Sequence, residues 1–222
     1  MKQRDKAIIE DLHRFRCLAR NDIIDLHFKG LKQPVTCANT VLKRLRRDGY
    51  IEVNTDRLPF VYFPSPTPIK KDSAKIPHFL KIADFYKSLL KFEEPEMFLV
   101  EPKYGKKGEY MEPDAFMIWK QGPFFVEIQQ SVYSHKLMAE KVARYESYYL
   151  RDSWKQEPWQ PEDQKIFPPV IMITDTRYQI NSSLVKFFQV PNINYLLPPS
   201  KPVNHVNNKI EININSVKLV EA

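Results

Sequence analysis

Two acidic motifs hold the residues whose types are best suited to chemistry. They are Glu112-Pro113-Asp114 and Glu127-Ile128-Gln129. With Asp114 at the end of one strand and Glu127 on its neighbour, the two carboxylates would converge on a divalent ion, and the Ile128 carbonyl would add a third oxygen. Hard oxygen ligands suit Mg²⁺ or Mn²⁺, and such an ion can activate water and stabilise phosphoryl charge. Asp114 and Glu127 are therefore candidate metal ligands.

These motifs resemble the PD-(D/E)XK nuclease superfamily, in which an acid after a proline is followed one strand later by an acid, any residue and a lysine. The resemblance implies catalytic roles for Asp114, Glu127 and Gln129. Gln129 stands at the family's lysine position and carries no charge. Lys141 is the candidate replacement cation, because Lys141 and Tyr145 lie one helical turn apart and resemble the Gln-x-x-x-Tyr element of exonuclease-like members.

The same resemblance implies an acid on the first helix of the domain, where Asp84 is the candidate. Two carboxylates that share one site repel each other, so one of them should have a raised pKa without metal. We expect weak metal binding and slow or absent cleavage, since Gln129 can orient water but supplies no charge. The alternative is that both acids are surface carboxylates at strand ends, paired with Lys or Arg.

A basic helix is predicted over residues 36–47. Ala38, Val41, Leu42 and Leu45 form its apolar stripe, which leaves polar and basic side chains on the opposite face. Such a helix can pack on its neighbours and enter a major groove, with small polar groups near base edges and long cations on phosphates. The candidate DNA-binding residues are Thr36, Asn39, Thr40, Lys43, Arg44, Arg46, Arg47 and, in the following turn, Arg57.

The elements around this helix predict a winged helix-turn-helix domain over residues 1–66. Helices are expected over 5–18 and from the N-cap Asn21, and a hairpin over 50–53 and 60–63. Residues 1–68 carry 13 Lys and Arg against 8 Asp and Glu, whereas the rest of the chain carries 21 against 19. The excess of positive charge in the first part fits a polyanionic partner. The alternative is a structural three-helix bundle with a solvated basic face, or a wing that binds protein.

A Pro-rich linker is predicted over residues 67–76, followed by a second domain over 77–222. Its expected elements are a helix from His78, strands over 98–101, 110–119 and 123–129, a helix over 136–150, a strand over 170–174, a helix over 181–188 and a strand over 194–197. The last twenty residues suggest an edge strand and a tail. This order predicts an α+β protein whose second domain is an α/β sandwich with a mixed sheet, resembling the PD-(D/E)XK nuclease fold. A linker that buries little surface should leave the two domains separable.

Both halves together resemble the replication-relaxation family of plasmids and conjugative elements. The resemblance extends over about residues 5–200 and rests on the basic helix, the Pro-rich joint, Pro113-Asp114, Val126 to Gln129 and the Lys141-x-x-x-Tyr145 helix. It implies a DNA-binding accessory role in plasmid replication, relaxation or transfer. The implied partners are double-stranded DNA, a relaxase or replication initiator, and a second copy of the chain as a homodimer.

Two other functions stay open: a metal-dependent DNA endonuclease, and a winged-helix transcriptional regulator with a dimerising or sensing domain. An ATPase is excluded because five glycines leave no phosphate-binding loop. The histidines are too scattered for a zinc site. No apolar run could span a bilayer and the amino terminus has no signal core, so we expect a cytoplasmic protein that does not bind membranes. Trp154 and Trp159 are expected to anchor a long loop onto the sheet.

Overall fold

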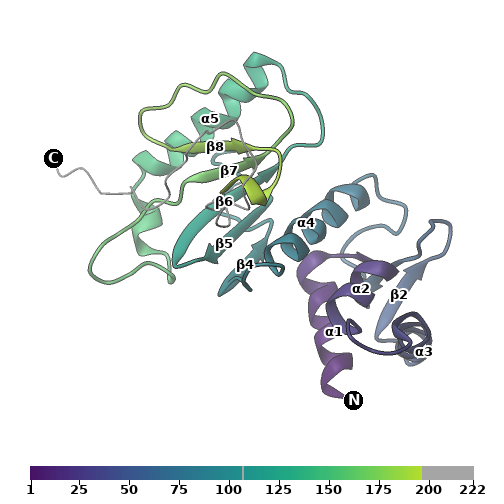
Figure 1. The fold of residues 1–222 in the computed structure, drawn as a ribbon. Helices are drawn as coiled ribbons and strands as arrows, with labels where there is room; N and C mark the ends of the chain where they lie inside the picture. The colour runs from purple at the N-terminus through teal and green to yellow at the C-terminus, as the bar shows by residue number, and fades with distance from the viewer. Residues whose placement is uncertain (107, 197–222) are drawn as a thin grey trace, which may run out of the picture.

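The computed structural model describes residues 1–106 and 108–196 (Figure 1). The chain begins with a helical part that carries a small sheet. Its elements are, in order, α1 (Gln3–Phe15), β1 (Leu18–Ala19), α2 (Arg20–His27), α3 (Pro34–Arg47), β2 (Ile51–Asn54) and β3 (Val61–Pro64). The three helices and the hairpin predicted for this part are therefore present.

Strand β3 lies at the centre of this sheet and is antiparallel to both neighbours, in the order β1-β3-β2. Tyr62 on β3 lies opposite Leu18 on one side and Val53 on the other. β1 was not predicted, because two residues are too few to show an alternating pattern. α3 begins at Pro34 and not at Thr36, since proline suits the first helical position, where its missing N–H costs no hydrogen bond.

The second part contains α4 (Ile76–Leu89), three antiparallel strands, a long helix and two further strands. The elements are β4 (Met97–Val100), β5 (Ala115–Trp119), β6 (Gly122–Ile128), α5 (His135–Leu150), the 3₁₀ helix η1 (Ser153–Gln156), β7 (Val170–Ile173), β8 (Phe187–Val190) and the 3₁₀ helix η2 (Ile193–Leu196). The strand order is β4-β5-β6-β7-β8, antiparallel up to β6 and parallel beyond it. The predicted α+β class and mixed sheet are confirmed.

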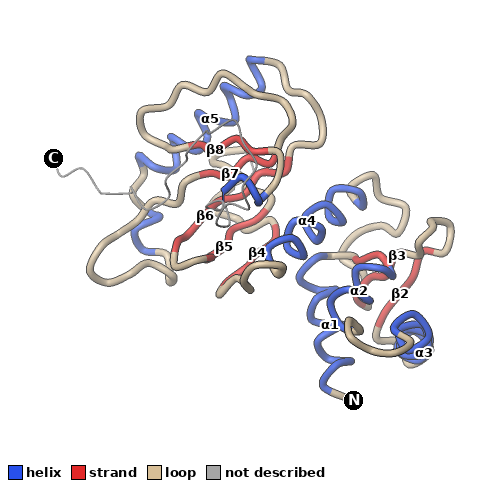
Figure 2. Tube along the Cα trace, in the orientation of Figure 1, coloured by secondary structure: helices blue, strands red, loops and turns tan. Residues whose placement is uncertain are grey.

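Helices cover both faces of this five-stranded sheet (Figure 2). On one face, Phe125 of β6 lies 5.7 Å from Tyr145 of α5, measured between ring centroids. On the other face, Val126 and Ile128 belong to the apolar cluster that includes the buried side of α4. The alternation along β6 follows from the two-residue period of a strand. It places Glu127 on the same face as α5.

Three predicted elements of the second part were wrong in type or position. Residues 181–188 form no helix, and β8 begins there at Phe187 because it pairs in parallel with β7, Val170 opposite Phe187. Residues 193–196 form η2 and not a strand. Strand β5 starts at Ala115, five residues later than expected from the sequence. The predicted edge strand and tail at the carboxyl end lie outside the described residues.

Helix α4 joins the two parts of the chain through a shared core. Phe15 of α1 lies 5.3 Å from Tyr86 of α4 and 6.1 Å from Phe98 of β4, measured between ring centroids. Lys87 of α4 donates to Asp22 of α2 at 2.5 Å. The Pro-rich segment therefore connects two parts that pack on each other. The Pro-rich composition of this segment is then no reason to expect that the two parts fold separately. The ranges 1–66, 67–76 and 77–222 stay a prediction.

The long segment after α5 is fixed to the sheet by its tryptophans, as predicted. Trp154 is 5% exposed, and Trp159 lies 4.8 Å from Phe116 of β5, measured between ring centroids. Among the helices of the described residues, none combines the length and the apolar character needed to cross a membrane.

Candidate nucleic-acid interface and carboxylate cluster

Helix α3 has one buried and one exposed face, as its sequence predicted. Ala38, Leu42 and Leu45 are buried against the rest of the amino-terminal part. The exposed side chains of α3 include six of the candidate DNA-binding residues: Thr36, Asn39, Thr40, Lys43, Arg46 and Arg47. A helix that packs through one side and presents amides, hydroxyls and cations on the other is suited to a major groove.

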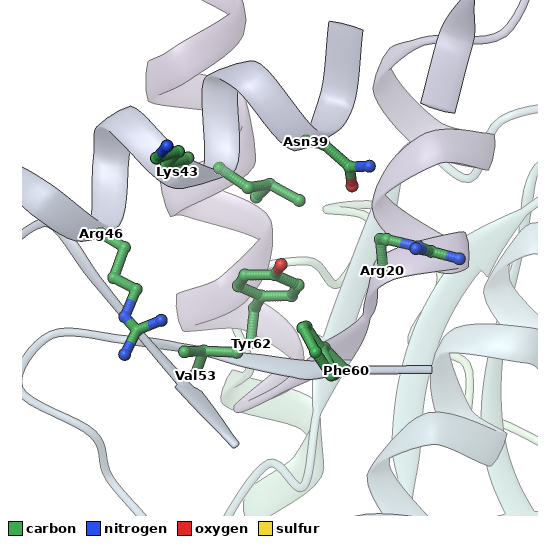
Figure 3. Close-up of a pocket in the computed structure, with 8 residues that line it drawn as sticks. Arg20, Asn39, Lys43, Arg46, Val53, Phe60 and Tyr62 are labelled. Atoms are coloured by element: carbon green, nitrogen blue, oxygen red, sulfur yellow. The ribbon is translucent and has the colours of Figure 1, made fainter. Parts of the chain in front are cut away.

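A hollow of about 270 Å³ lies beside this exposed face (Figure 3). We call it the basic hollow; its lining residues are Arg20, Asn39, Leu42, Lys43, Arg46, Val53, Phe60 and Tyr62. They come from α3, the start of α2 and the β2–β3 hairpin. Sequence reasoning found Asn39, Lys43 and Arg46 but missed Arg20, because only the pairing of β1 with β3 brings the start of α2 to the hairpin.

The basic hollow is electropositive around a buried phenol. Burial raises the pKa of Tyr62, and the nearby Arg20 and Arg46 guanidinium groups oppose that rise. Within the described residues, the buried Nε of Arg20 has no hydrogen-bond partner. A buried donor without a partner is costly. The cations Arg20, Lys43 and Arg46 that line the hollow suit its charge to an anion.

Arg44, one of the candidate DNA contacts, forms an ion pair within the chain. Its Nη2 donates to Oδ1 of Asp5 at 2.8 Å, and Asp5 is 1% exposed. Burial raises the pKa of the Asp5 carboxyl, but the Lys2 backbone N–H and Arg44 more than offset this and leave it lowered. Arg44 thus ties α3 to α1.

Two other predicted contacts also have neighbours inside the chain. Arg47 donates to Asp48 at 2.9 Å. Arg57 is half-buried, and its charge opposes the burial that raises the pKa of Cys17 to about 12. In the described part of the chain, Lys43 and Arg46 are the α3 cations that make no ion pair, which leaves them available to phosphates.

The second predicted site forms on the central strand β6, beneath α5. Glu127 is 2% exposed and accepts two hydrogen bonds from α5. Lys141 Nζ donates to Glu127 Oε2 at 2.5 Å, and Tyr145 Oη donates to Glu127 Oε1 at 2.7 Å. The four-residue spacing of Lys141 and Tyr145 places both donors on one side of the helix. The structure thus brings these three predicted residues together.

Asp114 lies beside Glu127, because Ala115 of β5 pairs with Val126 of β6. Oδ2 of Asp114 accepts the Ile128 N–H at 2.6 Å, and Oδ1 lies 3.2 Å from Nε2 of His78 at the start of α4. Nε2 of His78 also lies 4.0 Å from Oε1 of Glu101. We define the carboxylate cluster as His78, Glu101, Asp114, Glu127, Lys141 and Tyr145. His78 was missed as a site residue, because no local pattern relates the start of α4 to β5.

Two other candidates for this site lie elsewhere. Asp84 is an error of the sequence analysis: it faces Lys87 at 3.1 Å, on the side of α4 that packs against α2. Gln129 donates to the backbone carbonyl of Ser131 at 2.8 Å and not to either acid. Asp84 is therefore not part of this site, and the Gln129 amide, which was expected to orient water, donates to a backbone carbonyl.

Burial and pairing act in opposite directions on Glu127 and Lys141. Burial raises the pKa of the Glu127 carboxyl, opposed by the Lys141 ammonium. Burial lowers the pKa of Lys141, but the Glu127 charge more than offsets this and leaves it raised. Since both Glu127 oxygens accept hydrogen bonds from donors on α5, the geometry favours the ionised pair.

The carboxylate cluster does not fit the predicted Mg²⁺ or Mn²⁺ site. Both Glu127 oxygens and one Asp114 oxygen already accept hydrogen bonds. No group of three or more His, Cys, Asp or Glu in the described ranges is placed to hold a metal ion. The Lys141 ammonium provides the positive charge that these acids require.

The His78–Asp114 pair should make stability depend on pH. The hydrogen bond to Asp114 raises the pKa of His78 above its ordinary 6.5, although burial opposes the shift. A raised folded-state pKa stabilises the fold below the unfolded value, and this contribution is lost as pH rises through the folded value. The free energy of unfolding of the wild type should exceed that of His78→Gln by about 1 kcal/mol or less at pH 5.5. The difference should vanish by pH 9 in urea titrations. A difference that grows with pH would contradict the pair.

A comparison with family models gives a match for the middle of the chain. Residues 65–161 match the family model described as Replication-relaxation. The match confirms the family resemblance over that range, which is less than half of the chain and does not include α3. Searches of curated proteins and of solved structures gave no match.

Proposed function

We propose that this chain, whose residues 65–161 match the Replication-relaxation family model, is a DNA-binding accessory protein of plasmid replication, relaxation or conjugative transfer. The observation that carries the proposal is the basic hollow, where Lys43 and Arg46, which form no ion pair with the residues that the structure describes, lie beside the exposed polar side chains of α3. Cations without internal partners are the groups that contact phosphates, and amides such as Asn39 read base edges.

The order of elements supports a winged-helix domain. Three helices are followed by the β2–β3 hairpin, and β1 completes a three-stranded sheet. In a helix-turn-helix domain the recognition helix enters the major groove, and the position of α3 before the hairpin supports that role for it. The match to the Replication-relaxation family model favours a relaxase or a replication initiator as the protein partner.

The second part is proposed to be a nuclease-like domain that does not cleave. The order α4, three antiparallel strands, α5 and the parallel strand β7 supports the likeness. Cleavage by that fold depends on a metal held by the two acids, and here Glu127 is paired with Lys141 and Tyr145. The rival function, a metal-dependent endonuclease, is therefore disfavoured.

The proposal is tested by the salt dependence of binding to duplex DNA. Each phosphate contact contributes about 0.9 to the slope of log K against log salt. The double variant Lys43→Ala/Arg46→Ala should therefore lower the slope by nearly two units and weaken binding at least about tenfold near 0.1 M salt. Fluorescence anisotropy with a labelled duplex measures both.

The matched control is Lys81→Ala/Lys136→Ala, which removes two exposed lysines from α4 and α5. It should keep the wild-type slope. A wild type that binds no duplex, or a Lys43→Ala/Arg46→Ala variant with an unchanged slope, would refute the assignment of α3 as the DNA-binding helix.

A further inference from the structure

A hollow of about 800 Å³ lies between helices α2 and α4, which lie side by side (Figure 1). We call it the α2–α4 groove and define it by its lining residues Ile24, Leu26, Lys29, Lys87, Leu90 and Lys91. Its volume is about three times the 270 Å³ of the basic hollow. A hollow of this size can bury several side chains of a partner molecule.

The acids of the groove gather around one lysine. Asp25 and Asp84 also line the groove, and their carboxylates lie 3.2 and 3.1 Å from the ammonium of Lys87. Asp22, which is buried, lies 2.5 Å from the same ammonium. These acids are therefore directed at Lys87, and the cations that remain for a partner lie elsewhere in the groove.

Lys29 and Lys91 are the cations of the groove that have no acid of their own. Both side chains are exposed, and neither makes a hydrogen bond or an ion pair with the residues that the structure describes. Ile24 and Leu90 supply apolar surface in the same groove, and Leu90 is 37% exposed. The groove is therefore suited to an apolar side chain that is flanked by carboxylates.

The segment that follows α4 carries such a group, and we call residues 92–96 the acidic segment. Phe92 is 47% exposed, and Glu93 and Glu96 are exposed and make no ion pair within the described part of the chain. The backbone N–H groups of Phe92 and Glu93 donate to the Leu89 carbonyl at 2.9 and 3.0 Å. Trp119 Nε1 donates to the Glu93 carbonyl at 3.0 Å. A segment fixed in this way loses little conformational freedom when it is buried in a complex.

Phe92 does not fill the groove of its own chain. It directly follows Lys91, which lines the groove, but Phe92 itself is not among the lining residues and stays half exposed. The groove and the acidic segment are therefore neighbours on one surface. A two-fold interface requires a surface that is complementary to itself. This surface meets the requirement, because it has an apolar projection beside an apolar groove and two acids beside two lysines.

We infer that two copies of this chain associate about a two-fold axis, with Phe92 of each copy in the α2–α4 groove of the other. Lys29 and Lys91 then face the acids Glu93 and Glu96 across the interface. The inference does not rest on the proposed DNA binding, and it gives the expected homodimer a surface. With one aromatic anchor per copy and charges at an exposed rim, we expect a dissociation constant of about 1–10 µM.

Sedimentation velocity of the full chain without DNA tests the dimer. Between about 1 and 100 µM the wild type should pass from monomer to dimer. Phe92→Ala should associate at least about tenfold more weakly, because the anchor is removed. The matched control Leu150→Ala, which removes a leucine that is 68% exposed at the end of α5, should associate as the wild type does. Phe92 is half exposed in the single chain, so its replacement leaves the core intact, and circular dichroism verifies that the variant is folded.

Exchanging the charges identifies the contact. The variants Lys29→Glu/Lys91→Glu and Glu93→Lys/Glu96→Lys each place like charges across the interface, so each alone should associate at least about tenfold more weakly. All four side chains are exposed, so the fold does not depend on them. A one-to-one mixture of the two variants should recover the dimer, because acids meet lysines again on both sides of the axis.

Three outcomes would overturn the inference. A wild type that stays monomeric at about 200 µM leaves the groove to some other protein. A Phe92→Ala variant that dimerises as the wild type does would exclude Phe92 as the anchor. A mixture of the charge variants that stays monomeric would refute the assigned contact. Since no measurement contains DNA, each of these results leaves the proposed DNA binding untouched, and a dimer that binds no duplex refutes only that function.

Discussion

Replacing Lys141 by methionine is expected to lower the thermal midpoint by about 6–20 °C. The substitution keeps much of the side-chain volume but leaves Glu127, 2% exposed, without its cation. Breaking a buried ion pair by removing one partner costs about 3–5 kcal/mol. In a chain of this length each kcal/mol shifts the midpoint by about 2–4 °C. Calorimetry or thermal circular dichroism measures the effect.

The double variant Glu127→Gln/Lys141→Met should recover most of this loss, because neither charge remains. The double-mutant cycle then isolates the energy of the pair. Millimolar Mn²⁺ should leave the wild-type midpoint unchanged, raise that of Lys141→Met by neutralising the freed acids, and have no effect on the double variant. A wild-type midpoint that rises with Mn²⁺, together with plasmid nicking lost in Glu127→Ala, would favour the endonuclease.

Replacing Phe15 by alanine should destabilise the part of the chain that contains every tryptophan. The three tryptophans stand at positions 119, 154 and 159, all beyond α4. The side chain of Phe15, the last residue of α1, is fully buried against Tyr86 and Phe98. Its removal therefore leaves a cavity in the core that the two parts share. A buried Phe→Ala change costs about 3–5 kcal/mol. The unfolding transition followed by tryptophan fluorescence should therefore move down by about 6–20 °C.

The same experiment decides whether the two parts fold together. Independent domains would leave the tryptophan transition of Phe15→Ala at the wild-type temperature, while circular dichroism detected a second, lower transition in the helices. A fragment ending at Thr67 gives a further check. It lacks α4, exposes Phe15 and leaves Asp22 without Lys87, so we expect poorly dispersed spectra from it.

The strongly patterned elements were predictable from local sequence. The apolar stripe of Ala38, Leu42 and Leu45 specifies a helix whichever partner it packs on. The segment around Phe187 was not predictable, because a short apolar run suits either a helix or a strand, and its pairing with β7 decided the matter. The two residues of β1 likewise form a strand only because β3 lies beside them.

The residues of the candidate sites were likewise predictable where a local pattern contains them, and not where distant segments bring them together. Glu127, Lys141 and Tyr145 were found because the first belongs to a recognisable motif and the others share a helical spacing. A raised pKa was predicted for one of the two acids, and the pKa of Glu127 is raised. Its main cause, burial, was not predictable, since it depends on how α5 lies on the sheet. Arg20 and His78 were missed for the same reason: each reaches its site through contacts between distant segments.

The shared helix α4 has a consequence for how a second protein would meet the DNA. Because α1, α2 and β4 all pack on α4, the five-stranded sheet and the part that carries α3 share one core. A partner carried on that sheet would therefore face one particular side of the double helix. Inserting roughly 5 base pairs, half a turn, between the binding site and the partner's own site would rotate that side away. Inserting a full turn would restore it, so under the proposed DNA-binding function the shared core would set the helical phase between the two sites.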